Sequence, residues 1–209
     1  MNRLSTSVEL PEPRTARGRR TQQRLLAAAE EVFGTMGFDA ASIVEITRTA
    51  GVAQGTFYTY FPHKEAAFIA LVHSLAEQLT EAVRVAAQDA PTWMERERAS
   101  LRAFFRFTAE HRSLYRIIRQ AEFVDEELYR AYYRRIAAGY ARSIRTAVRQ
   151  GELRDLDVDT LAWSLMGVAD FLGMRWVLWE GREPPDAVID AALDLLRAGV
   201  QLTGNGEPA

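Results

Sequence analysis

The side chains best suited to recognition chemistry lie in residues 42–64, which read SIVEITRTAGVAQGTFYTYFPHK. Between Ala53 and Lys64 this segment carries no acidic residue, and most of its side chains end in a hydrogen-bonding group. A glutamine can bond adenine through two atoms, a threonine methyl can contact thymine, and a tyrosine hydroxyl can reach a phosphate oxygen. The segment is therefore predicted to contact nucleic acid through Gln54, Thr56, Tyr58, Thr59 and Tyr60.

Two short helices are expected to position these side chains. Ser42-Ile43-Val44-Glu45 has the form of a capping box, which predicts a helix from Ser42 to the residue before Gly51. A second helix is predicted from about Gln54 to Phe61, because Pro62 then stops it. This is the helix-turn-helix plan, in which the second helix enters the major groove of DNA. The residues predicted to face inward are Ile43, Ile46, Ala50, Val52, Phe57 and Phe61.

Charged and polar residues flank the two helices. His63 and Lys64 are expected to open the next helix, whose first amides favour a phosphate oxygen. Ser42 is interpreted as a helix cap first and as a phosphate donor second. Residues 1–17 are predicted to be a flexible basic arm, although a basic run is often only solvated surface. The arginines that occur here without an intervening acid are Arg14, Arg17, Arg19, Arg20 and Arg24.

Helical periodicity continues along the rest of the chain, without the two-residue alternation of strands, so the fold class is predicted to be all-α with nine helices. The expected ranges are about 21–35, 42–50, 54–61, 64–87, 92–110, 114–121, 125–150, 157–180 and 186–202. A DNA-binding domain is predicted at 18–77, with its motif at 42–61. A C-terminal helical domain is predicted at 78–203, followed by a disordered tail at 204–209.

Composition excludes several functional classes. The 209 residues include no cysteine, so disulfides, thiolate zinc sites, iron–sulfur clusters and cysteine nucleophiles are excluded. The three histidines are too scattered for a metal cage, and we expect no cofactor. The sequence has neither a phosphate loop nor a Gly-x-Ser-x-Gly elbow, so an enzyme is not predicted.

One apolar run, Leu161–Trp179, raises the question of a membrane span. Asp170 and Arg175 lie inside it, and each would cost about 3 kcal/mol at the centre of a bilayer. A buried helix and no membrane contact are therefore predicted. The first 18 residues contain no apolar stretch of the secretory type, which predicts a cytoplasmic location.

Residues 20–70 resemble the N-terminal domain of TetR/AcrR-type transcriptional regulators. Two positions depart from the usual pattern: Thr47 stands in place of alanine, and Ala53 stands where a serine often caps the second helix. Beyond residue 75 the resemblance extends only to helix number and length. The matching pieces are Leu25 to Phe33, Gly37-Phe38, Ile46, Ala50-Gly51-Val52, Gly55-Thr56-Phe57-Tyr58, Tyr60-Phe61 and Lys64-Glu65.

The resemblance implies a homodimer that binds a palindromic operator, with recognition helices about one DNA turn (~34–36 Å) apart or somewhat more. It implies that Gly55 belongs to the contact surface and that Arg19 and Arg20 reach the DNA backbone or minor groove. It also implies that a small effector enters the C-terminal domain, shifts the helix at 64–87 and releases DNA. The helices at 157–180 and 186–202 would form the dimer interface, where Gly167 and Gly173 permit close approach.

The effector is open at this point. Aromatic residues of the C-terminal half are candidates for a pocket, although most aromatic stripes are core. Asp170 and Arg175 are interpreted either as an ion pair or as ligand contacts. Four arginines, Arg116, Arg119, Arg134 and Arg135, suit either solvated surface or the phosphates of a coenzyme A thioester. The other candidate ligand contacts are Phe104, Phe107, Tyr115, Phe123, Tyr132, Tyr133 and Trp163.

A different class of function stays compatible with the sequence. A helical adaptor that binds only protein, or a ligand carrier without enzymatic activity, would share the composition and helical pattern. DNA binding with a steep dependence on salt would distinguish a regulator from both.

Overall fold

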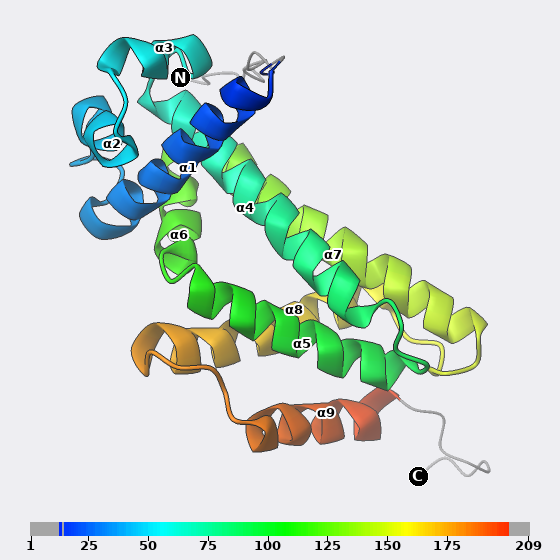
Figure 1. Ribbon diagram of the computed structural model, residues 1–209. Helices are drawn as coiled ribbons and strands as arrows, with labels where there is room; N and C mark the ends of the chain where they lie inside the picture. The colour runs from blue at the N-terminus through cyan, green and yellow to red at the C-terminus, as the bar shows by residue number, and fades with distance from the viewer. Residues whose placement is uncertain (1–12, 14, 201–209) are drawn as a thin grey trace, which may run out of the picture. The chain divides into compact units, whose positions relative to one another are not determined.

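The computed structural model describes residues 13 and 15–200 and contains helices but no strands within that part of the chain (Figure 1). The all-α prediction is thereby confirmed. A π-helical segment, η1, continues α8. The elements are α1 (Ala16–Met36), α2 (Ile43–Ala50), α3 (Gln54–Tyr60), α4 (Lys64–Ala87), α5 (Trp93–Glu110), α6 (Leu114–Val124), α7 (Glu126–Arg149), α8 (Val158–Gly173), η1 (Met174–Trp179) and α9 (Asp186–Val200).

The first helix begins earlier than predicted. Thr15 caps α1, because its hydroxyl oxygen accepts a hydrogen bond from the amide of Gly18 at 3.0 Å. Arg17, Arg19 and Arg20 consequently lie in α1, not in an arm before it. The rest of the predicted arm, residues 1–12 and 14, and the predicted tail at 204–209 lie outside the described residues.

The chain folds into two compact units. The first contains the described residues up to Glu77 together with Arg112–Tyr132, and the second contains Gln78–His111 and residues 133–200. Residues 112–132, which lie within the predicted C-terminal domain at 78–203, are grouped with the first unit by their contacts, chiefly those between α6 and α1. The reason is the packing of α6 against the end of α1, which sequence periodicity does not reveal.

The α1–α6 packing combines close approach with three hydrogen bonds. A Cβ on Gly34 would overlap the Cβ of Ser113, so only glycine permits this separation. The hydroxyl of Ser113 donates to Glu30 Oε1 at 2.9 Å, and Arg116 Nη1 donates to the carbonyl oxygen of Gly34 at 3.2 Å. The amide of Phe38 donates to Gln120 Oε1. The C-terminal end of α1 is therefore attached to α6 at several successive points.

Aromatic packing forms the centre of the first unit. The ring of Phe68 in α4 meets those of Phe33 and Phe38 edge-on, with centroids 5.2 and 5.1 Å away. Leu25 and Phe33 of α1 are fully buried, as is Ile46 of α2. Since each buried aromatic side chain removes about 150–250 Å² from water, this cluster holds α1 and α4 in place beneath the two short helices.

The second unit is a helical bundle with two apolar clusters. One joins α5, α7, α8 and α9 through residues that include Trp93, Ile144, Leu165 and Val200. The other joins α5, α8 and α9 through Leu101, Phe105, Ala169, Ile189 and Leu193. The stretch Val158–Trp179 is long and apolar enough to cross a membrane by length and composition alone. Ala162, Leu165 and Ala169 of this stretch belong to the two clusters, whereas its Trp163, Phe171 and Trp179 are exposed.

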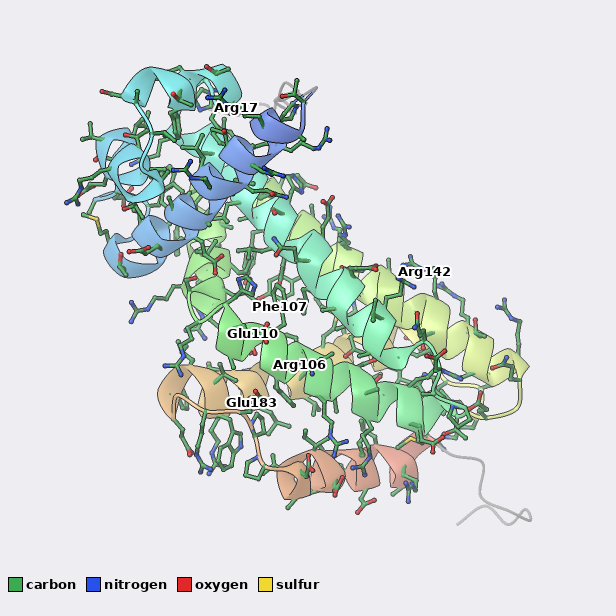
Figure 2. All side chains as sticks on the ribbon, in the orientation of Figure 1. Arg17, Arg106, Phe107, Glu110, Arg142 and Glu183 are labelled. Atoms are coloured by element: carbon green, nitrogen blue, oxygen red, sulfur yellow. The ribbon has the colours of Figure 1, made fainter. Side chains whose placement is uncertain are left out.

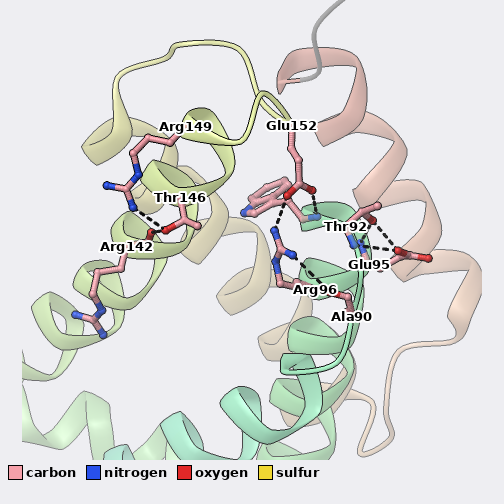
Figure 3. A network of polar contacts seen from close by, with 9 residues as sticks. Ala90, Thr92, Glu95, Arg96, Arg142, Thr146, Arg149 and Glu152 are labelled. Atoms are coloured by element: carbon pink, nitrogen blue, oxygen red, sulfur yellow. Dashed lines mark hydrogen bonds and ion pairs between the residues drawn. The ribbon is translucent and has the colours of Figure 1, made fainter.

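Polar contacts tie the start of α5 to the segment after α7 (Figure 3). Thr92 and Glu95 form a capping box, in which the Thr92 hydroxyl accepts from the Glu95 amide at 3.3 Å. Glu152 accepts hydrogen bonds from the Trp93 amide and from Arg96 Nη2, the latter at 2.9 Å. These bonds fix the first turn of α5. They thereby help to set which side of that helix faces the core.

Candidate nucleic-acid interface

The capping box at the start of α2 is confirmed. The Ser42 hydroxyl oxygen accepts a hydrogen bond from the Glu45 amide at 3.2 Å. In return, Glu45 Oε2 accepts from the Ser42 amide at 3.1 Å and from the Ser42 hydroxyl at 2.8 Å. Because the hydroxyl proton of Ser42 is directed to Glu45, a bond to phosphate would have to replace this one. The cap is established here, and the phosphate contact stays a prediction.

Two features fix the turn between α2 and α3, namely the conformation of Gly51 and the hydrogen bonds of Arg24. Gly51 adopts a left-handed conformation (φ 64°, ψ 40°), which favours glycine. Arg24 in α1 donates through Nη2 to the carbonyl oxygens of Ala50 at 2.6 Å and of Gly51 at 3.3 Å. Arg24 therefore caps the C-terminal end of α2, and this contact helps to set the direction in which α3 leaves the turn.

The two departures from the usual sequence pattern have local consequences. Thr47 is buried, and its hydroxyl donates to the carbonyl oxygens of Ile43 at 2.9 Å and Val44 at 3.0 Å, so the helix itself satisfies the added polar group. Ala53 provides no side-chain cap for α3, as predicted. Losing such a cap costs about 1 kcal/mol, which tertiary packing of α3 must replace.

Two phenylalanines supply that packing. Phe57 and Phe61 are buried, and their ring centroids lie 5.5 Å apart. Ile46 and Ala50 of α2 are also buried, whereas Ile43 and Val52 are only half-buried. The predicted inward face is therefore correct in its centre, with Ile43 and Val52 at its edge.

The opposite side of α3 is open to solvent. Gln54, Gly55, Tyr58 and Thr59 are exposed, with 52% of the Tyr58 surface accessible. A Cβ on Gly55 would meet no atom within 4 Å, so the backbone here lies bare at the surface. Thr56 and Tyr60 are half-buried and contribute less of this face than predicted. The exposed part of α3 is thus polar and free of charge, which suits the edges of bases in a groove.

The start of α1 lies beside the end of α3. A Cβ on Gly18 would lie 3.6 Å from the hydroxyl oxygen of Tyr60. The neighbours of Gly18 in the sequence include three exposed arginines: Arg17, which Figure 2 labels, Arg19 and Arg20. These arginines therefore belong to a helix whose start lies beside the end of α3, and a helical position costs them less conformational entropy on binding than a flexible arm would.

The structure gives Lys64 and His63 different partners from those expected. Lys64 Nζ donates to the carbonyl oxygens of Phe38 at 2.6 Å, Asp39 at 3.3 Å and Ala41 at 3.0 Å. An ammonium group has three hydrogens, so these bonds occupy all of them. His63 Nδ1 accepts from the Ala66 amide at 3.1 Å and thereby caps α4. In this structure both residues hold the loop and the helix start.

The nitrogen of His63 that caps α4 also lies 3.2 Å from Glu65 Oε2. A single Nδ1 atom cannot accept the Ala66 amide hydrogen and donate to a carboxylate at the same time. The cap is the interaction that satisfies an otherwise unpaired helix amide, so Nδ1 of His63 is assigned as the acceptor of that bond.

Comparison with known proteins identifies the family. The family model of bacterial regulatory proteins, tetR family, matches residues 25–71, and that of the tetracyclin repressor-like C-terminal domain matches residues 90–200. The chain belongs to the TetR family. This TetR-family protein is 28% identical over 195 residues to the HTH-type transcriptional regulator YdgC of Bacillus subtilis, covering 91% of this chain and 97% of the relative.

Two further matches also come from Bacillus subtilis. The fatty acid metabolism regulator protein of Bacillus subtilis is 26% identical over 183 residues, which cover 85% of this chain and 94% of that protein. The crystal structure of the transcriptional regulator FadR from Bacillus subtilis in complex with stearoyl-CoA superposes with a TM-score of 0.71 at 24% identity. The superposition covers 85% of this chain and 98% of FadR, and it demonstrates the shared fold.

The predicted ligand contacts are divided between the two units. Tyr115, Phe123 and Tyr132 belong to the first unit, and the other candidates belong to the second. Phe123 is 87% exposed and therefore does not line an interior site. Phe107, Tyr115 and Tyr132 are buried, while Phe104 and Tyr133 are half-buried and Trp163 is exposed.

The Asp170–Arg175 hypothesis is also revised. Arg175 extends to solvent and pairs with Glu180, with Nε 3.5 Å from Oε1. Asp170 is half-buried in α8. Arg175 lies in the π-helical segment η1, which directly follows Gly173.

One polar residue of the second unit was missed. Glu97 is buried in α5, and the hydroxyl of Tyr140 in α7 donates to its Oε1 at 3.4 Å. Burial raises the pKa of the Glu97 carboxyl to about 7, although the Tyr140 hydrogen bond opposes the shift. The signal was present in the sequence, because Glu97 interrupts an apolar stripe with four-residue spacing formed by Trp93, Leu101 and Phe105.

Proposed function

We propose that this TetR-family protein is a ligand-responsive transcriptional repressor of the bacterial cytoplasm. It binds a palindromic operator as a homodimer, and a small, largely apolar effector in the second unit releases it. The observation that carries the proposal is the outer side of α3, where Gln54, Gly55, Tyr58 and Thr59 are exposed while Phe57 and Phe61 anchor the helix.

Base reading is assigned to the exposed polar residues of α3. Gln54 can pair with adenine through two hydrogen bonds, and a pair of this kind contributes about 1–3 kcal/mol of discrimination. Gly55 lets the backbone approach the duplex, and Tyr58 reaches a phosphate or base edge. Arg17, Arg19 and Arg20 contact phosphates, so they contribute affinity and salt dependence without sequence preference.

Exposed apolar residues support a dimer through α8 and α9. Trp163, Phe171, Trp179 and Leu195 are each between 45% and 72% exposed, and all lie on α8, η1 or α9. Large apolar side chains gathered on neighbouring elements mark an interaction surface. A second copy of this chain fits because the symmetric packing of two such helix pairs would bury the same patch on both subunits.

The nature of the effector is proposed from the relatives. One curated relative is named a fatty acid metabolism regulator, and FadR was crystallised with stearoyl-CoA. These names support an acyl-CoA as a candidate effector here, although Arg116 bonds the carbonyl oxygen of Gly34 and is not simply free for phosphate. The named relatives are transcriptional regulators, which favours this function over an adaptor or a carrier.

The decisive experiment is a gel shift with DNA from upstream of the protein's own gene, at several salt concentrations. A repressor of this kind shows specific binding with a steep salt dependence. Gln54→Ala should weaken binding to that site about 5- to 150-fold and leave binding to unrelated DNA unchanged. Gln150→Ala is the matched control, since Gln150 is exposed at the end of α7. Specific binding that is unaffected by Gln54→Ala would refute the assignment of α3.

The dimer and the effector have separate tests. Phe171→Asp places a charge in the apolar patch, so we expect monomers by sedimentation and loss of operator binding. Glu183→Asp, at an exposed site after η1, is the control that should remain dimeric. A thermal-shift series with acyl-CoAs tests the effector, and the absence of any shift would exclude that class.

A further inference from the structure

Glu97 is a carboxyl group buried in the second unit with little to compensate its charge. Only 4% of its surface is exposed. Trp93 and Leu101 lie one turn before and after it on the same side of α5, and both are buried. Within the described part of the chain, its hydrogen bond comes from the Tyr140 hydroxyl at 3.4 Å, which is long for an O–H donor. An ionised carboxylate can accept about four such bonds.

The cations next to Glu97 in sequence are engaged elsewhere. Arg96 Nη2 bonds Glu152 at 2.9 Å, and Arg98 pairs with Asp190 of α9. Both arginines therefore point away from the buried carboxyl. An unpaired buried charge is strongly destabilising, so burial of the ionised form of Glu97 carries a substantial energetic cost. The raised pKa of Glu97 has the same physical origin, namely desolvation of the charged form.

We propose that Glu97 and Tyr140 form the recognition point for an effector that carries a protonated amine on an apolar or aromatic body. The ammonium group supplies the missing positive charge and donates hydrogen bonds to Glu97. The apolar body of the ligand packs in the surroundings formed by the cluster around Trp93 and Ile144, to which Tyr140 also belongs.

This inference rests on the proposed function, since it takes the second unit to be the effector-binding part, and it specifies the ligand class. It separates amines from acyl-CoAs. The phosphates of a CoA thioester are anionic and gain nothing from a buried carboxylate. An amine gains an ion pair in surroundings of low polarity, where such a pair is stronger than in water.

Proton linkage gives the proposal a signature of its own. An ammonium ion bound to Glu97 stabilises the ionised carboxylate, so below pH 7 binding must expel the carboxyl proton. Affinity for an amine therefore rises with pH up to about 7 to 8 and then levels off, by as much as tenfold per pH unit. An uncharged alcohol of the same shape expels no proton.

The experiment is isothermal calorimetry on the full-length protein with two matched pairs of probes, phenethylamine with 2-phenylethanol and hexylamine with 1-hexanol. Titrations at pH 6 and pH 8, in buffers of different ionisation enthalpy, measure affinity and proton release together. We expect each amine to bind at least tenfold more tightly than its alcohol at pH 8. At pH 6 we expect proton release with the amines only.

Variants assign the effect to Glu97. Glu97→Gln keeps the shape and removes the charge, so it should retain alcohol binding and lose both the amine preference and the proton release. Glu97→Leu provides a second uncharged variant, which keeps the test decisive if the Glu97→Gln protein folds poorly. Glu110→Gln changes an exposed glutamate on the same helix and should behave as the unaltered protein (Figure 2). Tyr140→Phe should weaken the preference without abolishing it.

Equal binding of amines and alcohols, no binding of either amine, or an amine preference that survives in Glu97→Gln would each overturn the proposal. The gel shift separates this failure from failure of the proposed function. Operator binding that acyl-CoAs release, in a protein that ignores amines, refutes the Glu97 site alone. If the protein prefers amines but does not bind the operator, the proposed repressor function is refuted and the amine site at Glu97 is retained.

Discussion

The glycine at position 34 offers a sharp test of how α6 is attached to α1. In Gly34→Ala the new Cβ would overlap the Cβ of Ser113 and lie 3.4 Å from its Cα. The obstacle is close to the main chain of α6 and is not the end of a flexible side chain, so rotation alone cannot relieve it. The two helices must move apart, and the hydrogen bonds from Ser113 to Glu30 and from Arg116 to Gly34 must lengthen.

The expected cost follows from three contributions. Overpacking at a tight helix contact costs about 1–3 kcal/mol. Weakening two hydrogen bonds costs about 1 kcal/mol for each bond lost. Replacing glycine with alanine inside a helix stabilises the folded state by about 1 kcal/mol, which offsets part of this cost. With both hydrogen bonds lost, Gly34→Ala should therefore lower the free energy of unfolding by roughly 2–4 kcal/mol, despite the better helix former.

The assay is urea unfolding, followed by circular dichroism and tryptophan fluorescence, with Gly139→Ala as the matched control. Gly139 lies inside α7, and the nearest atom to an added Cβ there is Arg142 Nη2 at an ordinary 3.9 Å. The control should therefore gain up to about 1 kcal/mol. If both variants gained stability equally, α6 would not approach α1 as closely as described, and the assignment of residues 112–132 to the first unit would be wrong.

Three further predictions follow from individual residues. Gly55→Ala has open space for its Cβ, so stability by thermal unfolding should not fall, while operator affinity in a gel shift should drop at least tenfold as the methyl obstructs backbone approach; undiminished affinity would contradict close contact. Lys64→Met should lower the free energy of unfolding in urea by about 2–3 kcal/mol, because three carbonyl oxygens lose their donor, and an unchanged stability would favour a phosphate role instead. For Glu97 the folded pKa is raised from 4.5 to about 7, so the folded state holds the proton more tightly and stability falls as pH rises from about 4.5 to 7. The loss reaches about 3 kcal/mol by pH 8; Glu97→Gln should remove it in thermal unfolding between pH 5 and 8, and an unchanged pH profile in that variant would exclude a raised pKa.

Much of the DNA-facing site follows from patterns that neighbouring residues create. The Ser42–Glu45 box joins residues three positions apart, and Gly51 is needed for one left-handed turn. Phe57 and Phe61 are spaced by four, which places both on the inner side of a single helix and leaves Gln54 and Tyr58 outside. The early start of α1 had such a signal in Thr15, but the arginine-rich turn after it lacks the apolar spacing used to find helices.

The roles that sequence patterns did not reveal involve residues far apart in the chain. Lys64 bonds Phe38 across 26 positions, Ser113 bonds Glu30 across 83, and Glu97 meets Tyr140 across 43. A lysine at a helix start looks the same whether it faces phosphate or a folded loop. Its partner depends on how the helices pack, and no local pattern encodes that.

The amino-acid sequence alone therefore determined the helices, their caps, the turn and the polar face of α3, because hydrogen bonds and periodicity within about four residues specify these features. The tertiary structure decided where each charged side chain finds its partner: Arg24 and Lys64 on carbonyl oxygens, Arg175 on Glu180, and Glu97 in an apolar interior. The physical reason is that the energy of a charge depends on its surroundings, and the surroundings exist only once distant segments have come together.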